Sequence, residues 1–160
     1  MRNYSSLFES NQVDNADEAS TPGEIRVLIA DDHPQFRLVL EHVIGADPAM
    51  TVVAALGDGA TALEEIRRLA PDVAVLDVSM PGLDGIEVAG RLVDDQLGTR
   101  AVIVTMHSER VIFERAIAAG VSGYVLKDMA FSEVVEAIRA AARGQSYVSP
   151  SLSAAFGREK

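Results

Sequence analysis

The chain has 160 residues, a formal net charge of −10, 48% hydrophobic residues and no cysteine. This length fits one compact domain with a tail, and no apolar stretch approaches the roughly 20 residues that a membrane-spanning helix needs. The lack of cysteine excludes disulfides and thiolate metal sites, and the acidic charge argues against direct binding to nucleic-acid phosphates. The start of the chain also lacks the pattern of a signal peptide, so we expect a cytoplasmic protein without membrane contact.

In chain order, residues 1–24 are rich in Ser, Asn, Asp and Glu, which predicts a disordered acidic leader. From Ile25 onward, short apolar runs alternate with stretches of helical periodicity. Strands are predicted at 25–30, 51–56, 73–77, 101–105 and 123–126, and helices at 34–45, 59–69, 84–94, 109–119 and 132–143. This alternation favours an α/β fold with a doubly wound parallel sheet of five strands and five helices. The Ser-rich stretch from residue 145 to 160 loses the pattern and is interpreted as a linker or frayed end.

Capping residues support these boundaries. Ser108 and Asp84 precede predicted helices and are candidate N-caps. Gly45, Gly120 and Gly144 fall just past predicted helical stretches, where glycine commonly forms a left-handed C-terminal cap. The helix ends are therefore predicted from two independent signals, hydrophobic period and cap chemistry.

Polar side chains end four of the five predicted strands. Asp31 and Asp32 follow the first strand, Asp77 ends the third, Thr105 ends the fourth, and Lys127 follows the fifth. The carboxyl ends of parallel strands meet at one edge of the sheet, so these side chains should share one cleft. Three carboxylates so close need a cation, which predicts a divalent-metal site with Asp77 as an acidic nucleophile.

Each of these residues alone has a simpler interpretation. An isolated Asp after a strand is more often a turn or capping residue, and an isolated Lys is usually solvated. It is the complete set, in order along the strands, that favours chemistry. The histidines at 33, 42 and 107 lack the spacing of metal ligands. We expect His42 to face solvent, and His33 and His107 to lie near the mouth of the cleft.

Four segments of the chain together resemble the receiver domain of two-component response regulators. They are VLIADDHPQFR, PDVAVLDVSMPGLDGIE, VIVTMHSE and AAGVSGYVLKD. Lys127-Asp128, where many receivers have Lys-Pro, is similar to the NarL/FixJ (LuxR-type) class. The resemblance covers roughly residues 25–145. It implies a flavodoxin-like sheet with strand order 2-1-3-4-5, and it leaves residues 146–160 as a linker or as the start of a missing C-terminal DNA-binding module.

The resemblance also implies a role for each matching residue. Asp77 is expected to accept a phosphoryl group from a sensor histidine kinase, in a reaction that requires Mg²⁺. The Mg²⁺ ligands implied are the side chains of Asp32 and Asp77, the side chain of Asp31 acting through water or directly, and the backbone carbonyl of Ser79.

Two further residues complete the expected machinery. Lys127 would pair with the phosphoryl oxygens and Thr105 would hydrogen-bond to them, with the amides of Val78 and Met106 as further donors. Tyr124 matches the family's switch aromatic, which turns inward as Thr105 moves. The domain would catalyse only its own phosphorylation and dephosphorylation, so it is not expected to be an enzyme with an external substrate.

Several functional alternatives stay open. The chain is expected to control transcription through a helix-turn-helix domain that it does not contain, and to bind DNA only through that domain. A stand-alone receiver and a non-phosphorylated interaction module are the alternatives. A flavodoxin-like cofactor binder needs a phosphate cradle after the first strand, where Asp31 and Asp32 would instead repel phosphate. A homodimer could use the 109–119 helix with the 123–126 strand and the 132–143 helix, or the 34–45 and 132–143 helices.

Overall fold

The computed structural model describes residues 24–156. Its strands form one parallel sheet in the order β2-β1-β3-β4-β5-β6. The strands are β1 (Ile25–Ala30), β2 (Met50–Leu56), β3 (Val73–Leu76), β4 (Arg100–Thr105), β5 (Gly123–Leu126) and β6 (Tyr147–Val148). The flavodoxin-like order of the first five strands is confirmed. The expectation of five strands is wrong by one, because β6 extends the sheet beyond β5.

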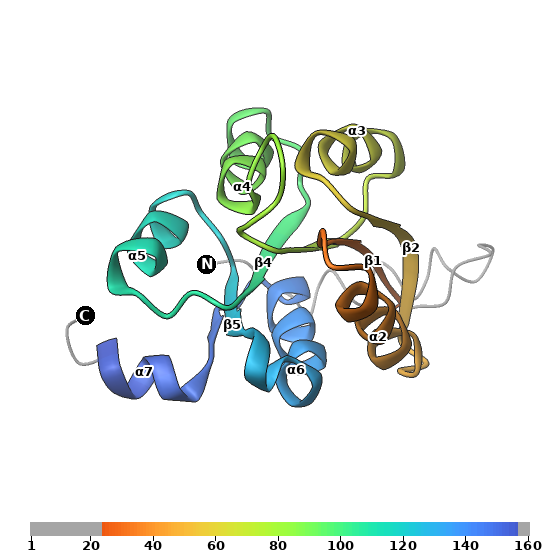
Figure 1. Ribbon diagram of the computed structural model, residues 1–160. Helices are drawn as coiled ribbons and strands as arrows, with labels where there is room; N and C mark the ends of the chain where they lie inside the picture. Colours follow the sequence, from red (N-terminus) through yellow and green to blue (C-terminus); the bar gives the residue numbers. More distant parts are fainter. Residues whose placement is uncertain (1–23, 157–160) are drawn as a thin grey trace.

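Helices cover both faces of this sheet (Figure 1). They are α2 (Pro34–Gly45), α3 (Gly59–Leu69), α4 (Gly85–Asp94), α5 (Arg110–Ala118), α6 (Ala130–Ala142) and α7 (Pro150–Phe156), with a 3₁₀ turn, η2, at Lys127–Met129. Helices α3 and α4 lie on one side and α2 and α6 on the other. The described residues thus contain six α-helices instead of the five predicted. Within the same residues, no helix has the length and apolar character needed to cross a membrane.

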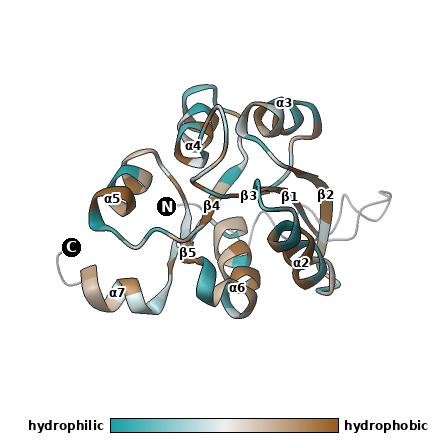
Figure 2. Ribbon diagram, in the orientation of Figure 1, coloured by the Kyte–Doolittle hydropathy of each residue, from teal (hydrophilic) through white to brown (hydrophobic). Residues whose placement is uncertain are grey.

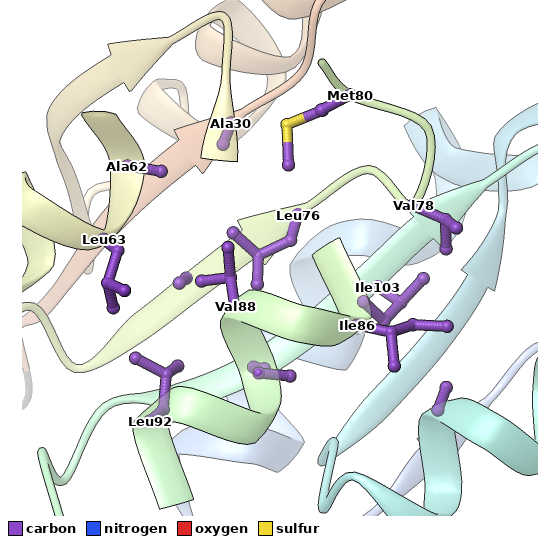
Figure 3. Close-up of a cluster of buried hydrophobic side chains, with 14 of the residues drawn as sticks. Ala30, Ala62, Leu63, Leu76, Val78, Met80, Ile86, Val88, Leu92 and Ile103 are labelled. Carbon is purple, nitrogen blue, oxygen red and sulfur yellow. The ribbon is translucent and has the colours of Figure 1, made fainter. Parts of the chain in front are cut away.

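The two faces of the sheet bury two separate cores. Successive residues of a strand point to opposite faces, so Leu28 joins one core and Ile29 the other, and both are fully buried. Figure 3 shows the first core, where Leu76 lies beside Val88 of α4 and Ile103 lies beside Ile86 of the same helix. Hydrophobic residues line the inner side of the helices in Figure 2. Burying each such side chain stabilises the fold by roughly 1.5–3 kcal/mol.

The structure confirms some of the predicted helix caps and contradicts others. Asp84 caps α4 as predicted, and a reciprocal capping box joins it to Glu87. Gly120 and Gly144 have the left-handed conformation, with φ of +93° and +76°. Two predictions are wrong: Gly45 is the last residue of α2 and the right-handed Ala46 caps it, while Glu109, not Ser108, stands at the N-cap of α5.

The C-terminal stretch is more ordered than its sequence suggests. Residues interpreted as a linker or frayed end form β6 and α7. Ser149 is fully buried between them, and Leu152 of α7 joins the first core. A two-residue strand and a helix of seven residues are too short for a periodic signal, so the hydrophobic pattern missed them. The predicted leader falls, except for Glu24, outside the described residues.

Candidate functional site

Asp31 and Asp77 leave neighbouring strands at the same edge of the sheet. They follow β1 and β3, whose last residues, Ala30 and Leu76, pair in register. The Asp77 amide donates a 2.9 Å hydrogen bond to the Ala30 carbonyl, and the Asp31 amide donates one of 2.9 Å to the Leu56 carbonyl. Both carboxyl side chains are buried. The backbone of the sheet therefore holds these two acids side by side with little freedom.

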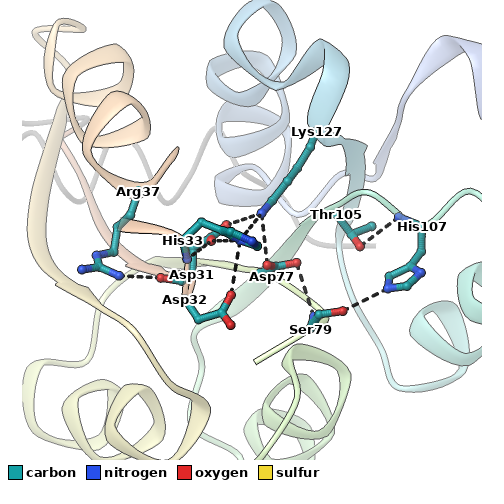
Figure 4. Close-up of polar contacts among 9 residues, drawn as sticks. All are labelled: Asp31, Asp32, His33, Arg37, Asp77, Ser79, Thr105, His107 and Lys127. Carbon is teal, nitrogen blue, oxygen red and sulfur yellow. Dashed lines mark hydrogen bonds and ion pairs between the residues drawn. The ribbon is translucent and has the colours of Figure 1, made fainter. Parts of the chain in front are cut away.

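The ammonium of Lys127, which follows β5, lies between the two acids (Figure 4). Its Nζ donates a 3.1 Å hydrogen bond to Asp77 Oδ2. It also lies 2.9 Å from Asp31 Oδ2, but that ion pair lacks hydrogen-bond geometry. Asp31 Oδ2 is thus a buried oxygen with no hydrogen-bond donor among the described residues. The Lys127 ammonium is therefore the charge that compensates this buried oxygen, and a metal ion that binds there would share the oxygen with Lys127.

The surroundings of Asp77 disfavour its charged form. Burial is the main cause that raises the pKa of the Asp77 carboxyl, and the nearby negative charge of Asp31 raises it further. The Lys127 ammonium and the Ser79 amide oppose this rise in the pKa, without cancelling it. A positive charge entering the site would lower the pKa again and leave Asp77 as a carboxylate with one oxygen available for attack.

Asp32 and His33 complete an acidic cluster above these residues. His33 Nδ1 lies 3.3 Å from Asp32 Oδ1 and 3.4 Å from both Asp31 Oδ1 and Lys127 Nζ. Ligand atoms of Asp31, Asp32, His33 and Asp77 all lie within 4.8 Å of one another. Carboxylate oxygens are the donors that Mg²⁺ prefers, so the three acids fit that ion.

A second chain of hydrogen bonds borders Asp77 on its other side. The Ser79 amide donates to Asp77 Oδ1 at 3.4 Å, and the Ser79 hydroxyl lies 3.0 Å from His107 Nε2. The His107 amide in turn donates to the hydroxyl oxygen of buried Thr105 at 3.1 Å. Within the described residues, no hydrogen bond joins Thr105 directly to Asp77. Thr105 therefore stands at the predicted edge but is engaged by the loop that follows it.

Tyr124 of β5 points inward and is fully buried. Its hydroxyl donates a 2.8 Å hydrogen bond to the His107 carbonyl, so it is tied to the same loop. The Phe113 ring of α5 packs against it edge to face, with centroids 5.2 Å apart. Burial, and next the charge of Glu109, raise the pKa of the Tyr124 phenol to about 12. Tyr124 is therefore neutral at physiological pH.

Gly85 allows helix α4 to approach the acceptor residue closely. A Cβ atom at this position would lie 2.2 Å from the Asp77 carbonyl oxygen, a distance that no side chain can accept. The Gly85 amide donates to the Val78 carbonyl at 3.2 Å, which closes the loop after Asp77. The start of α4 therefore restrains the backbone of the acceptor.

The structure brings together most of the residues predicted to share the cleft. Asp31, Asp32, Asp77 and Lys127 form one contact group, and Thr105 stands at its border. The sequence predicted His33 near the mouth of the cleft, but its spacing did not predict that Nδ1 would lie within 3.4 Å of Asp31 and Asp32. Its position directly after the Asp pair was the only available signal.

Comparison with known proteins gives the family. A family model described as "Response regulator receiver domain" matches residues 27–139. The chain is 40% identical over 131 residues to the "Probable transcriptional regulatory protein NarL" of Mycobacterium tuberculosis (strain ATCC 25618 / H37Rv), covering 82% of this chain and 61% of that protein. It is 35% identical over 129 residues to the "Nitrate/nitrite response regulator protein NarL" of Escherichia coli (strain K12), covering 79% and 59%. The chain thus spans about three fifths of the length of these relatives.

Solved structures agree with this result. The signal receiver domain of the putative response regulator NarL from Mycobacterium tuberculosis has a TM-score of 0.75 and 39% identity, over 78% of this chain and all of that one. A LuxR-family two-component response regulator from Aurantimonas sp. SI85-9A1 has a TM-score of 0.80 and 33% identity, over 85% and 97% of the two chains. The chain therefore belongs to the family of response regulator receiver domains, in the NarL/LuxR-type class.

Proposed function

We propose that this receiver domain is a switch in which Asp77 accepts a phosphoryl group from a sensor histidine kinase in the cytoplasm. One observation supports the proposal above all others. Asp77 is a buried carboxylate that contacts the Lys127 ammonium at 3.1 Å and stands beside the acids Asp31 and Asp32. This combination supplies an oxygen nucleophile, a fixed cation and additional acidic ligands at the edge where α/β proteins carry their chemistry.

The proposed reaction is a transfer between two covalent partners. An Asp77 oxygen forms a bond to phosphorus while the bond between phosphorus and the kinase imidazole nitrogen breaks, and that nitrogen keeps the electron pair. Lys127 would neutralise phosphoryl oxygens, and Thr105 would donate a hydrogen bond to them. Hydrolysis reverses the state: water bonds to phosphorus, and the Asp77–phosphorus link breaks to give free phosphate and the carboxylate. No external metabolic substrate is involved.

The acidic cluster is the proposed site of Mg²⁺. Asp31, Asp32, Asp77 and the Ser79 carbonyl would hold the ion, and the close grouping of the three carboxylates, with ligand atoms within 4.8 Å of one another, supports that assignment. When bound, Mg²⁺ would supply positive charge beside the phosphoryl oxygens. His33 would border the ion without being required as a ligand, because oxygen donors suit Mg²⁺ better than an imidazole nitrogen.

Thr105 and Tyr124 are proposed to convert the added charge into a change of shape. A phosphoryl group at Asp77 adds strong acceptor oxygens, to which the Thr105 hydroxyl would donate its hydrogen while its oxygen accepts from the His107 amide. Movement of Thr105 would shift the 105–109 loop, to which the Tyr124 hydroxyl is bonded. Phe113 packs on Tyr124, and Phe156 of α7 packs on Phe113 with centroids 5.3 Å apart. A change at Tyr124 could therefore reach the C-terminal helix.

The output is proposed to be transcription, through a helix-turn-helix DNA-binding domain that is not part of this sequence. The names of the relatives, which include transcriptional regulatory proteins, support this assignment. For self-association, exposed apolar side chains lie on α2 (Leu38, Val39), on α5 (Val111, Ile117) and on α6 (Phe131), so they do not distinguish the two faces. The outer edge of β5, however, is covered by β6. We therefore favour a dimer through α2 and α6 over one through α5, β5 and α6.

The test is Mg²⁺-dependent modification by acetyl phosphate, followed by intact-protein mass spectrometry. Wild type should gain the mass of one phosphoryl group, and Asp77→Asn should gain none. Asp94→Asn, the same change at an exposed residue of α4, is the matched control and should behave as wild type. Modification that persists in Asp77→Asn, or that ignores removal of Mg²⁺ by a chelator, would contradict the proposal.

A further inference from the structure

The Lys127 ammonium has an aromatic face as its fourth neighbour. Its Nζ lies 4.4 Å from the centroid of the Phe36 ring, in addition to its contacts with Asp31, Asp77 and His33. Only 6% of the Lys127 side chain is exposed, so its ammonium has almost no access to bulk water. The Phe36 ring therefore stands where hydrating water would otherwise be.

The ring is held in place from behind. Phe36 is in the first turn of α2, and its ring stacks on that of Phe131 in the first turn of α6, with centroids 5.2 Å apart and an interplanar angle of 28°. Phe131 is 47% exposed, so it lies at the surface and supports the Phe36 ring that faces Lys127. Two helices that are far apart in sequence thus cooperate to present one aromatic face to one cation.

This arrangement has an electrostatic consequence. The negative face of an aromatic ring attracts a cation, and the attraction is stronger where water is excluded. The ring therefore stabilises the charged Lys127 within the cleft and leaves the acidic side as the direction for its hydrogen bonds. Without the aromatic face, water could hydrate the ammonium and compete with the acids for it.

We propose that Phe36 is a positioning residue for phosphoryl acceptance, which holds the Lys127 ammonium toward Asp77 and the incoming phosphoryl oxygens. The inference rests on the proposed function, because it assumes that Lys127 acts on a phosphoryl group. Phe36 itself touches neither the acceptor oxygen nor the acidic ligands in any described contact. Its effect should therefore pass entirely through Lys127.

The experiment compares Phe36→Leu, which keeps an apolar side chain but removes the aromatic face, with Phe36→Tyr, which keeps the face. Rates of modification by acetyl phosphate at saturating Mg²⁺ should fall about 5- to 20-fold in Phe36→Leu and stay within about twofold of wild type in Phe36→Tyr. In a Lys127→Met background, Phe36→Leu should slow the reaction no further. A wild-type rate in Phe36→Leu, or an equal slowing in the Lys127→Met background, would overturn the proposal.

A second readout does not depend on the reaction. The ring should shift the NMR signals of the Lys127 ε-methylene protons upfield, and this shift should vanish in Phe36→Leu and persist in Phe36→Tyr. If wild type accepts no phosphoryl group at all, the proposed function fails, and the proposal that Phe36 positions Lys127 for it fails as well. If wild type reacts but the ε-methylene signals are the same in wild type and Phe36→Leu, only the role of Phe36 is refuted.

Discussion

At the scale of single residues, the buried position that suits Asp77 to its proposed chemistry lowers the stability of the fold at neutral pH. Its folded-state pKa is raised above the ordinary value of 3.8 by burial and by Asp31. The unfolded chain therefore releases this proton at a lower pH than the folded chain. The stability that protonated Asp77 provides is complete below pH 3.8 and is lost as the pH rises through the raised folded-state value. At neutral pH the acceptor is a destabilising residue.

Asp77→Asn should therefore stabilise the protein in the absence of divalent cations. The free energy of unfolding at pH 7 should rise by on the order of 1 kcal/mol, and the gain should shrink as the pH falls toward 4. Denaturant unfolding in the presence of a chelator at both pH values measures this. Asp94→Asn, at an exposed site, should change the free energy by less than about 0.5 kcal/mol. A less stable Asp77→Asn protein at pH 7 would contradict this account of the site.

At the scale of secondary-structure elements, one buried hydroxyl anchors the C-terminal segment. The Ser149 hydroxyl donates to Glu133 Oε1 of α6 at 2.6 Å and accepts from the Leu126 amide of β5 at 3.0 Å. Glu133 is itself buried. Burial first, and then the charge of Glu133, raise the pKa of the Tyr147 phenol of β6. The segment is thus held by polar contacts as well as by Leu152.

Ser149→Ala should loosen β6 and α7. It leaves the Glu133 carboxylate and the Leu126 amide without this partner, at a cost of about 1–3 kcal/mol in the free energy of unfolding. Denaturant titration gives the global effect, and amide hydrogen exchange should show faster exchange in residues 147–156. The matched control is Ser153→Ala, an exposed serine of α7, which should be neutral. Unchanged exchange in the Ser149 variant would show that apolar packing alone holds the segment.

At the scale of the whole molecule, the acidic cluster links folding to cations. The site gathers three acids and one Lys, in a chain with a formal net charge of −10. Because the cluster forms only in the folded state, an ion that binds there stabilises folding by mass action. At a concentration 100 times its dissociation constant, Mg²⁺ should raise the free energy of unfolding by about 2.7 kcal/mol.

Thermal unfolding with and without MgCl₂ tests this, with NaCl added to match ionic strength. The rise in midpoint should be large in wild type, smaller in Asp32→Asn, and full in Asp94→Asn. Equal rises in all three proteins would mean that Mg²⁺ acts by general screening of the acidic surface instead of by binding at the cluster.

The alternation of strands and helices could be predicted from sequence because it is local. β-Branched runs such as Val73–Leu76 are buried on both faces and read as strands by themselves. The order of the first five strands could be inferred only with the family resemblance. Residues 147–148 and α7 escaped prediction, since their stability comes from the edge of β5 and from buried Ser149.

By itself, the sequence determined which polar residues follow which strands. Because the strands are parallel, Asp31, Asp77 and Lys127 then lie at the same edge of the sheet. Only the tertiary structure determined which groups the side chains at this edge contact. In the structure, the Thr105 hydroxyl accepts a hydrogen bond from the His107 amide, His33 lies in the acidic group, and the Phe36 ring faces the Lys127 ammonium. The physical reason is that strand ends are specified by local pattern, whereas contacts between loops and helix ends depend on packing between segments distant in sequence.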